Sequence, residues 1–236
     1  MTLTDPLEIW KIIAPHYVSI IDQAPHNALY ERPAMRSLIG RPQGLNVLDI
    51  GCGSGYYLEY LLQSGAASVT GVDGNEYMID ACARRTNNAA RLFTADLRQQ
   101  LPFLQNNQFD LAVASLVLHY LEDWTGLLKE LHRVIRPKGN LVISTGHPLS
   151  DFAESTSGNY FELELIREEW SSFGVTMPGY RRPFGSLIND FCDAGFRLTR
   201  VLEPVPLPEM ADVKPKSFEK LNKKPGFICL RFEKVS

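Results

Sequence analysis

A short apolar segment that runs directly into three closely spaced glycines constrains this chain more than any other feature. The segment reads Val47-Leu48-Asp49-Ile50-Gly51-Cys52-Gly53-Ser54-Gly55. Glycine lets a backbone turn sharply and approach a ligand closely. In open α/β sheets, ligands bind beyond the carboxyl ends of the strands. The segment therefore predicts a buried strand, a ligand-binding turn and a following helix.

Further apolar runs alternate with amphipathic stretches, which is the pattern of a parallel sheet covered by helices on both faces. Apolar residues recur at helical spacing over 123–136, and the Pro137-Lys138-Gly139 turn ends that predicted helix. We predict an α/β fold whose core is a Rossmann-like, doubly wound, mostly parallel sheet. Its first five strands are expected at residues 45–50, 68–72, 90–93, 109–115 and 140–145.

The chain is expected to form a single domain over residues 1–236, with the core at 45–146. Residues 1–44 form a predicted helical arm. Its first helix carries an apolar face and is expected to be interrupted at Pro15, and a second helical segment follows over about 28–39.

Beyond the core the strand and helix rhythm breaks. Residues 147–183 are interpreted as an inserted lid, in which Phe161, Leu163 and Leu165 alternate with glutamates as in a strand. The remaining segment, 184–236, is expected to hold a helix at 186–194, strands at 198–202 and 227–233, and between these strands a mobile, solvated loop rich in proline and lysine.

Three details of the glycine segment discriminate between possible ligands. The dinucleotide fingerprint GxGxxG needs a small residue where Tyr56 stands, which argues against NAD and FAD. A phosphate-binding P-loop needs a lysine, and none lies near this turn, which argues against ATP and GTP. Asp49 would repel a pyrophosphate but attract an ammonium or sulfonium group. The turn therefore favours a positively charged ligand.

Two further aspartates follow the next two predicted strands. Asp73 ends the second strand, where an acidic side chain reaches ribose hydroxyls in Rossmann-type sites. Asp96 follows the third strand, within reach of an adenine amino group, for which a carboxylate is a good acceptor. Either aspartate alone could instead belong to a turn or a helix cap, and for Asp96 taken alone that is the favoured interpretation. The ordered trio of Asp49, Asp73 and Asp96 favours a nucleoside that carries a positive charge.

On these motifs the chain resembles the class I S-adenosylmethionine-dependent methyltransferases, especially the small-molecule group that includes ubiquinone- and menaquinone-biosynthesis-like enzymes. The resemblance covers roughly residues 45–145, and 109–121 and 133–139 match the family's fourth-strand segment and fifth-strand approach. It implies S-adenosylmethionine as cofactor and a seven-stranded sheet whose last strand, at 227–233, runs antiparallel. The cofactor-binding residues it implies are Tyr17, Asp49, Gly51, Cys52, Gly53, Gly55, Asp73, Gly74, Met78, Asp96, Leu97, Ser115 and Leu116.

Methyl transfer from a sulfonium needs alignment, exclusion of water and, for a protonated acceptor, a base. His119, just past the fourth strand, and His147, after the fifth, are the candidate catalytic residues. Packing at a strand end or a role in a loop is the alternative for each. Side chains of the arm and lid that could line an acceptor pocket are Tyr17, Asn27, Tyr30, Tyr160, Tyr180, Arg181 and Arg182.

The expected partner is a small-molecule methyl acceptor that the sequence does not identify. The net charge of -3 gives no reason to expect nucleic acid, and Ser115-Leu116-Val117-Leu118 stands where nucleic-acid amino methyltransferases carry Asn/Asp-Pro-Pro-Tyr/Phe. Neither a membrane nor a metal is expected, and four scattered cysteines fit a cytoplasmic protein. A cofactor-binding regulatory protein without catalysis and a macromolecular methyltransferase remain open, as does the oligomeric state.

Overall fold

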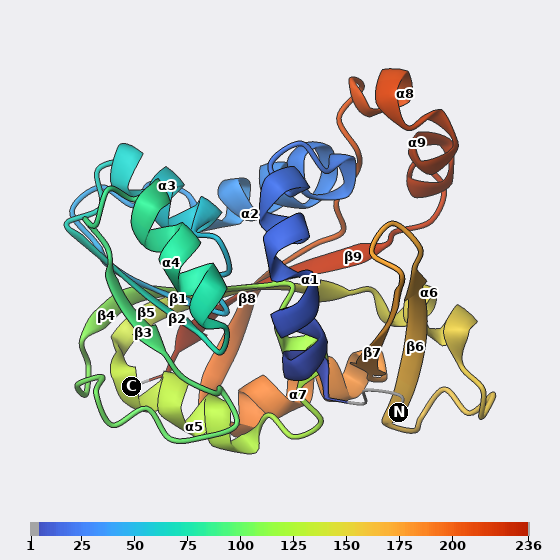
Figure 1. The fold of residues 1–236 in the computed structure, drawn as a ribbon. Coiled ribbons are helices and arrows are strands. Elements are labelled where there is room, and N and C mark those ends of the chain that lie inside the picture. Colours follow the sequence, from blue (N-terminus) through green and yellow to red (C-terminus); the bar gives the residue numbers. More distant parts are fainter. Residues whose placement is uncertain (1–4, 236) are drawn as a thin grey trace.

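The computed structural model describes residues 5–235 (Figure 1). Its main sheet has seven strands in the order β3-β2-β1-β4-β5-β9-β8. Neighbouring strands from β3 to β5 pair in parallel, whereas β9 pairs antiparallel with both β5 and β8. This is the mostly parallel sheet that the sequence predicts. Its strands are β1 (Asn46–Ile50), β2 (Ser68–Asp73), β3 (Arg91–Thr94), β4 (Phe109–Ser115), β5 (Ile135–Gly146), β8 (Phe196–Leu202) and β9 (Phe227–Lys234).

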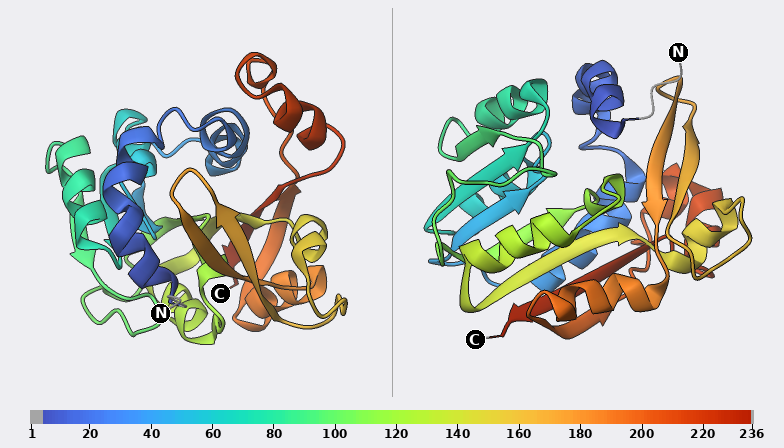
Figure 2. Two further views of the ribbon diagram at one scale, coloured as in Figure 1. Left: turned by 45° about the vertical axis from the view of Figure 1, so that its right-hand side comes forward. Right: turned by 90° about the horizontal axis from the view of Figure 1, so that it is seen from below.

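Helices cover both faces of this sheet, as the views in Figure 2 show. Side chains of β1 alternate between the two layers, since Val47 packs with one cluster and Leu48 and Ile50 with the other. By the same alternation Asp49 faces the layer of Val47. That layer contains α2 (Arg32–Ile39), α3 (Tyr56–Gln63) and α4 (Glu76–Arg85), and the opposite layer contains α5 (Thr125–Val134) and α7 (Phe184–Asp193).

The arm begins with one continuous helix, α1 (Pro6–Ile20), so the interruption predicted at Pro15 is wrong. Proline in a helix interior removes the hydrogen bond to the carbonyl four residues earlier. Here both Lys11 and Pro15 are exposed, and water can satisfy the carbonyl of Lys11. The chain then passes through a short π-helix, η1 (Asn27–Glu31), directly into α2.

Helix α5 ends two residues earlier than predicted, at Val134, and β5 begins at Ile135. The predicted turn at Pro137-Lys138-Gly139 therefore lies inside β5. Lys138 adopts a φ of 63°, and the register between β4 and β5 shifts between Phe109 and Leu111. The turn is accommodated as a strand irregularity because Phe109 and Ile135 already pair before it.

The insert contains α6 (Pro148–Asp151), the short helix η3 (Phe152–Glu154) and a separate antiparallel hairpin of β6 (Glu164–Trp170) and β7 (Val175–Arg181). The alternating run predicted from Phe161 is only partly a strand, since β6 begins at Glu164. Phe161 is 83% exposed and packs on no sheet.

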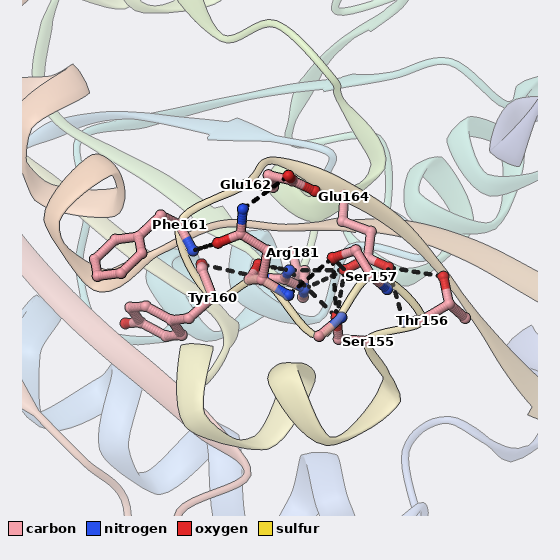
Figure 3. A network of polar contacts seen from close by, with 10 residues as sticks. Ser155, Thr156, Ser157, Tyr160, Phe161, Glu162, Glu164 and Arg181 are labelled. Carbon is pink, nitrogen blue, oxygen red and sulfur yellow. Dashed lines mark hydrogen bonds and ion pairs between the residues drawn. The ribbon is translucent and has the colours of Figure 1, made fainter.

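A polar network holds the residues before β6 in a loop (Figure 3). The buried guanidinium of Arg181 donates from Nε to Glu164 Oε2 at 2.8 Å and from Nη2 to the carbonyl of Asn159 at 2.6 Å. Glu164 also accepts hydrogen bonds from Ser155 Oγ and from the backbone N–H of Ser157. The loop is folded around the ion pair of the buried Arg181 and the partly buried Glu164 instead of extending the hairpin.

The connection between β8 and β9 is not the solvated loop that the sequence predicts. It contains α8 (Met210–Val213) and α9 (Pro215–Leu221), and Met210 and Leu221 pack against the buried ring of Tyr30. Pro215 occupies the first position of α9, where its missing N–H has no intrahelical partner to lose. Among residues 5–235, no helix combines the length and apolarity needed to cross a membrane.

Replacing Phe191 with Ala should destabilise the protein by about 3–5 kcal/mol, because its ring is fully buried and stacks on Phe232 with centroids 4.4 Å apart. Urea unfolding followed by circular dichroism measures the loss. Phe161→Ala is the matched control and should change stability by less than about 0.5 kcal/mol. Equal losses in the two variants would contradict the assignment of Phe191 to the core.

Candidate functional site

A cavity lies at the carboxyl ends of β1, β2 and β4, beneath α1 and η1. Every residue predicted from the sequence to bind the cofactor lines this cavity except Gly55. The sequence did not single out several other residues of its wall, which come mostly from the arm and from the loops after β2, β3 and β4. They are Asp5, Pro6, Leu7, Trp10, Ile21, Glu31, Arg32, Ser54, Tyr57, Asn75, Arg98, Val117, Tyr120 and Leu121.

The glycine turn after β1 is packed against neighbouring side chains. Gly51 and Gly55 adopt φ values of 69° and 84°, a region that favours glycine. A Cβ on Gly51 would lie 2.4 Å from a Val117 methyl carbon, and one on Gly55 would lie 2.5 Å from Cys82 Sγ. Gly55 therefore serves the packing of α3 against α4, which explains why it is absent from the cavity wall.

Asp73 ties this turn to the end of β2. Its Oδ2 accepts a hydrogen bond from the backbone N–H of Gly53, and its Oδ1 accepts one from the N–H of Asn75, both at 2.9 Å. Burial raises the pKa of Asp73, and these two hydrogen bonds oppose the rise. A carboxylate accepts about four hydrogen bonds, so Asp73 keeps capacity for donors from the cavity.

Asp96 is held by a neighbouring arginine. Nε and Nη2 of Arg98 both donate to the Asp96 carboxylate, and Nη1 of Arg98 reaches Asp5 Oδ2 at 3.1 Å. Burial acts to raise the pKa of Asp96, but the hydrogen bonds from Arg98 outweigh it and leave the pKa below its usual value. Asp96 is therefore an ionised acceptor at the edge of the cavity, and Arg98 fastens the start of the arm to it.

Asp49 is the most unusual group of the cavity. Its side chain is 1% exposed, and neither carboxylate oxygen has a hydrogen-bond partner among residues 5–235. Burial raises the pKa of Asp49 well above its usual range, with further contributions from Cys82, Asp73 and Glu31. An unpaired buried carboxylate is costly unless a cation neutralises it. The site therefore fits a ligand that places an ammonium group against β1.

Two charged residues of the arm, Glu31 and Arg32, reach the same cavity. Glu31 accepts hydrogen bonds from Tyr57 Oη at 2.7 Å, Ser115 Oγ at 2.7 Å and Ser144 Oγ at 2.5 Å. The Arg32 guanidinium lies 3.7 Å from the centroid of the Tyr56 ring and donates to two backbone carbonyls near the end of α1. No motif in the sequence marks Glu31 or Arg32 as residues of the site.

An aromatic cluster holds α1 over the cavity. The ring of Trp10 makes edge contacts with Tyr17, Tyr120 and Trp170, with centroid distances of 4.7, 5.9 and 5.8 Å. Phe173, in the turn of the β6–β7 hairpin, lies 5.7 Å from Trp170. The arm and the hairpin thus pack together beside the carboxyl ends of the strands.

The two predicted catalytic histidines lie outside the cavity wall. His119, in the short helix η2 (Leu118–Tyr120), has its Nδ1 3.5 Å from Thr145 Oγ1, and burial lowers its pKa to about 4. His147 accepts a hydrogen bond at Nδ1 from the N–H of Leu149, which caps α6, and its Nε2 lies 2.9 Å from Glu203 Oε1. Both imidazoles contact the protein scaffold.

Of the side chains proposed from the sequence to line an acceptor pocket, some line this cavity and others lie away from it. Tyr17 and Asn27 line the cavity. Tyr30 is buried against Phe227 and accepts the backbone N–H of Gly226 through Oη. The four residues from the insert and its end do not reach the cavity wall; they are Tyr160, Tyr180, Arg181 and Arg182.

Comparison with known proteins agrees with this geometry. The family described as methyltransferase domain matches residues 48–143. The chain is 28% identical to a solved S-adenosylmethionine-dependent methyltransferase from Mesorhizobium loti, covering 86% of this chain and 97% of that one with a TM-score of 0.74. The chain belongs to the class I S-adenosylmethionine-dependent methyltransferases. Its cofactor is S-adenosylmethionine. The fold is also similar to that of a solved methyltransferase structure from Listeria monocytogenes, with a TM-score of 0.76.

Curated relatives give three further similarities. An uncharacterized protein of Haemophilus influenzae is 26% identical, with 89% of each chain covered. A demethylmenaquinone methyltransferase of Lactococcus lactis is 25% identical over 96% of this methyltransferase and 83% of that protein. A fatty-acid O-methyltransferase of Mycolicibacterium smegmatis is 34% identical over a region that covers 48% of this chain and 41% of that protein.

Asp49→Asn should weaken binding of S-adenosylhomocysteine by about 10- to 100-fold, since it removes a charged partner of the cofactor's ammonium group. Calorimetric titration measures this affinity. Asp80→Asn, on the exposed face of α4, is the control and should bind normally. Undiminished affinity in Asp49→Asn would contradict the role inferred for the buried carboxylate.

The Asp49→Asn substitution should also change how the stability of the cofactor-free protein depends on pH. Because burial raises the folded-state pKa of Asp49, the wild type loses stability as pH rises from about 4, its unfolded pKa, through the folded pKa. Asparagine does not titrate, so Asp49→Asn should lack this loss and unfold at a higher temperature than the wild type at pH 8. Thermal unfolding at pH 5 and pH 8 tests the sign.

Proposed function

We propose that this methyltransferase transfers the methyl group of S-adenosylmethionine to a small molecule. The observation that carries the proposal is the cover over the cavity: Leu7 and Trp10 of α1 lie across it, and Trp10 packs on the β6–β7 hairpin. A covered site of this kind favours a metabolite over a bulky macromolecule. The names of two relatives point the same way, one for a fatty acid and one for demethylmenaquinone.

The cofactor's orientation follows from the order of acidic groups along the strand ends. Asp73 would accept hydrogen bonds from the ribose hydroxyls, and Asp96 with Leu97 would flank the adenine. Met78 adds an apolar wall on the nucleoside side. Asp49 would hold the ammonium group. This orientation runs the cofactor from β3 towards β4 and brings its methionine end to the glycine turn and to Ser115 and Leu116.

The protein's contribution to methyl transfer is alignment and exclusion of water. Bound S-adenosylmethionine supplies an electrophilic methyl group on a sulfonium. Asp49 would fix the ammonium group of the cofactor and Asp73 its ribose. Helix α1 would shield the reacting end of the cofactor from solvent. His119 and His147 stay predictions as catalytic residues, and their protein contacts support a structural role at the strand ends as well.

Radiolabelled S-adenosylmethionine tests the acceptor class. We expect label to enter the small-molecule fraction when the protein is incubated with a deproteinised bacterial metabolite extract, and not to enter purified RNA, DNA or protein added separately. The Asp49→Asn variant controls for cofactor-dependent transfer. Label in a macromolecule, or binding of S-adenosylhomocysteine without any transfer, would overturn the proposed function in favour of a macromolecular target or a regulatory role.

A further inference from the structure

The position of Glu31 sets it apart from the cofactor-binding aspartates. Ser115 ends β4 and pairs in register with Ser144 of β5, and both serine hydroxyls donate to Glu31. Asp73 ends β2 and Asp96 follows β3, on the other side of β1. The carboxylate of Glu31 therefore lies on the β4 and β5 side of the cavity, away from the proposed nucleoside contacts and on the side to which the proposed orientation brings the sulfonium and methionine portion of the cofactor.

The hydrogen bonds of Glu31 leave one acceptor position open. A carboxylate has about four positions for donors. Oε1 receives the hydroxyls of Ser115 and Ser144, and Oε2 receives that of Tyr57. One position on Oε2 remains, and Glu31 lines the cavity. Three hydroxyl groups thus fix a buried carboxylate that can accept one more hydrogen bond from a molecule in the cavity.

The charge of the cavity restricts what that molecule can be. Arg98 is bound to two aspartates, whereas Arg32 donates to two backbone carbonyls, lies over the Tyr56 ring and keeps further N–H groups that can bind one anionic group, such as the carboxylate of the cofactor. No lysine occurs among the described residues of the wall. Against these two guanidiniums stand five carboxylates of the wall, those of Asp5, Glu31, Asp49, Asp73 and Asp96. With Arg32 available for the cofactor's carboxylate, a second carboxylate carried by the acceptor next to Glu31 would meet charge repulsion.

We infer that Glu31 is the catalytic base of the proposed reaction and that the acceptor is a proton-bearing hydroxyl, thiol or amine group. The inference rests on the proposed small-molecule function. The acceptor heteroatom forms a bond to the methyl carbon while the carbon–sulfur bond breaks. The electron pair of that bond stays on sulfur, giving the thioether S-adenosylhomocysteine, and the acceptor's proton passes to the Glu31 carboxylate. Burial raises the pKa of Glu31, which strengthens it as a base near neutral pH.

The chemical class of the product tests the acceptor. The labelled small-molecule product is treated with mild alkali, which hydrolyses a carboxyl methyl ester and releases labelled methanol. Methyl ethers, thioethers and methylamines keep their label. We expect the label to resist alkali. Release as methanol would overturn the inference and leave the proposed function intact, whereas absence of any labelled product would refute the proposed function and with it this inference.

Variants test the base. Glu31→Gln should lower the initial rate of labelling by at least about 100-fold, while calorimetry shows nearly unchanged affinity for S-adenosylhomocysteine. Glu31→Asp keeps a displaced carboxylate and should be intermediate, with a rate that rises with pH as in the wild type. Glu209→Gln, an exposed glutamate distant from the cavity, is the matched control.

Three results would contradict this role. An unchanged rate in Glu31→Gln would exclude Glu31 as the base, and a large loss in His119→Gln alone would assign the proton to His119. Loss of S-adenosylhomocysteine binding in both Glu31 variants, with normal thermal unfolding, would make Glu31 a cofactor ligand and overturn the inference as well.

Discussion

The close packing of the glycine turn after β1 is the constraint on which the rest of the site depends. Val117 fills the space where Gly51 would carry a side chain, and Cys82 does the same at Gly55. These contacts join β4 and α4 to one turn of backbone. The N–H of Gly53 is then fixed on Asp73. Three strand ends are thereby brought to one wall, and the positions of Asp49, Asp73 and Ser115 follow from it.

The site also shows how binding opposes stability. Asp49 and Glu31 are both 1% exposed and lie in the same cavity, but they differ in their hydrogen-bond partners. Glu31 is supported by three hydroxyl donors, whereas Asp49 has none among the described residues. A carboxylate left unpaired in the folded protein costs free energy that a cationic ligand can return. The protein is thus expected to be most stable with its cofactor bound.

Much of the fold and of the cofactor side of the cavity could be predicted from the sequence, because both follow from local patterns. Strand ends in a parallel sheet meet at one edge, so Asp49, Asp73 and Asp96 could be grouped without a structure. Glu31 and Trp10 could not, since they reach the cavity by packing of the arm onto the sheet. His147 shows the converse: it follows β5 as predicted, but the chain turns at once into α6 and uses the imidazole as a cap.

Because α1 covers the cavity, the position of this helix determines how far solvent can reach the bound cofactor. Trp10 and Tyr17 both line the wall, and Pro15 lies between them in the helix. The missing hydrogen bond at Pro15 makes this the point at which α1 bends with the least loss of helical structure. The edge contact between the rings of Trp10 and Tyr17 spans this position and ties the two halves of the helix together, so a bend at Pro15 that opened the cavity would have to separate these two rings.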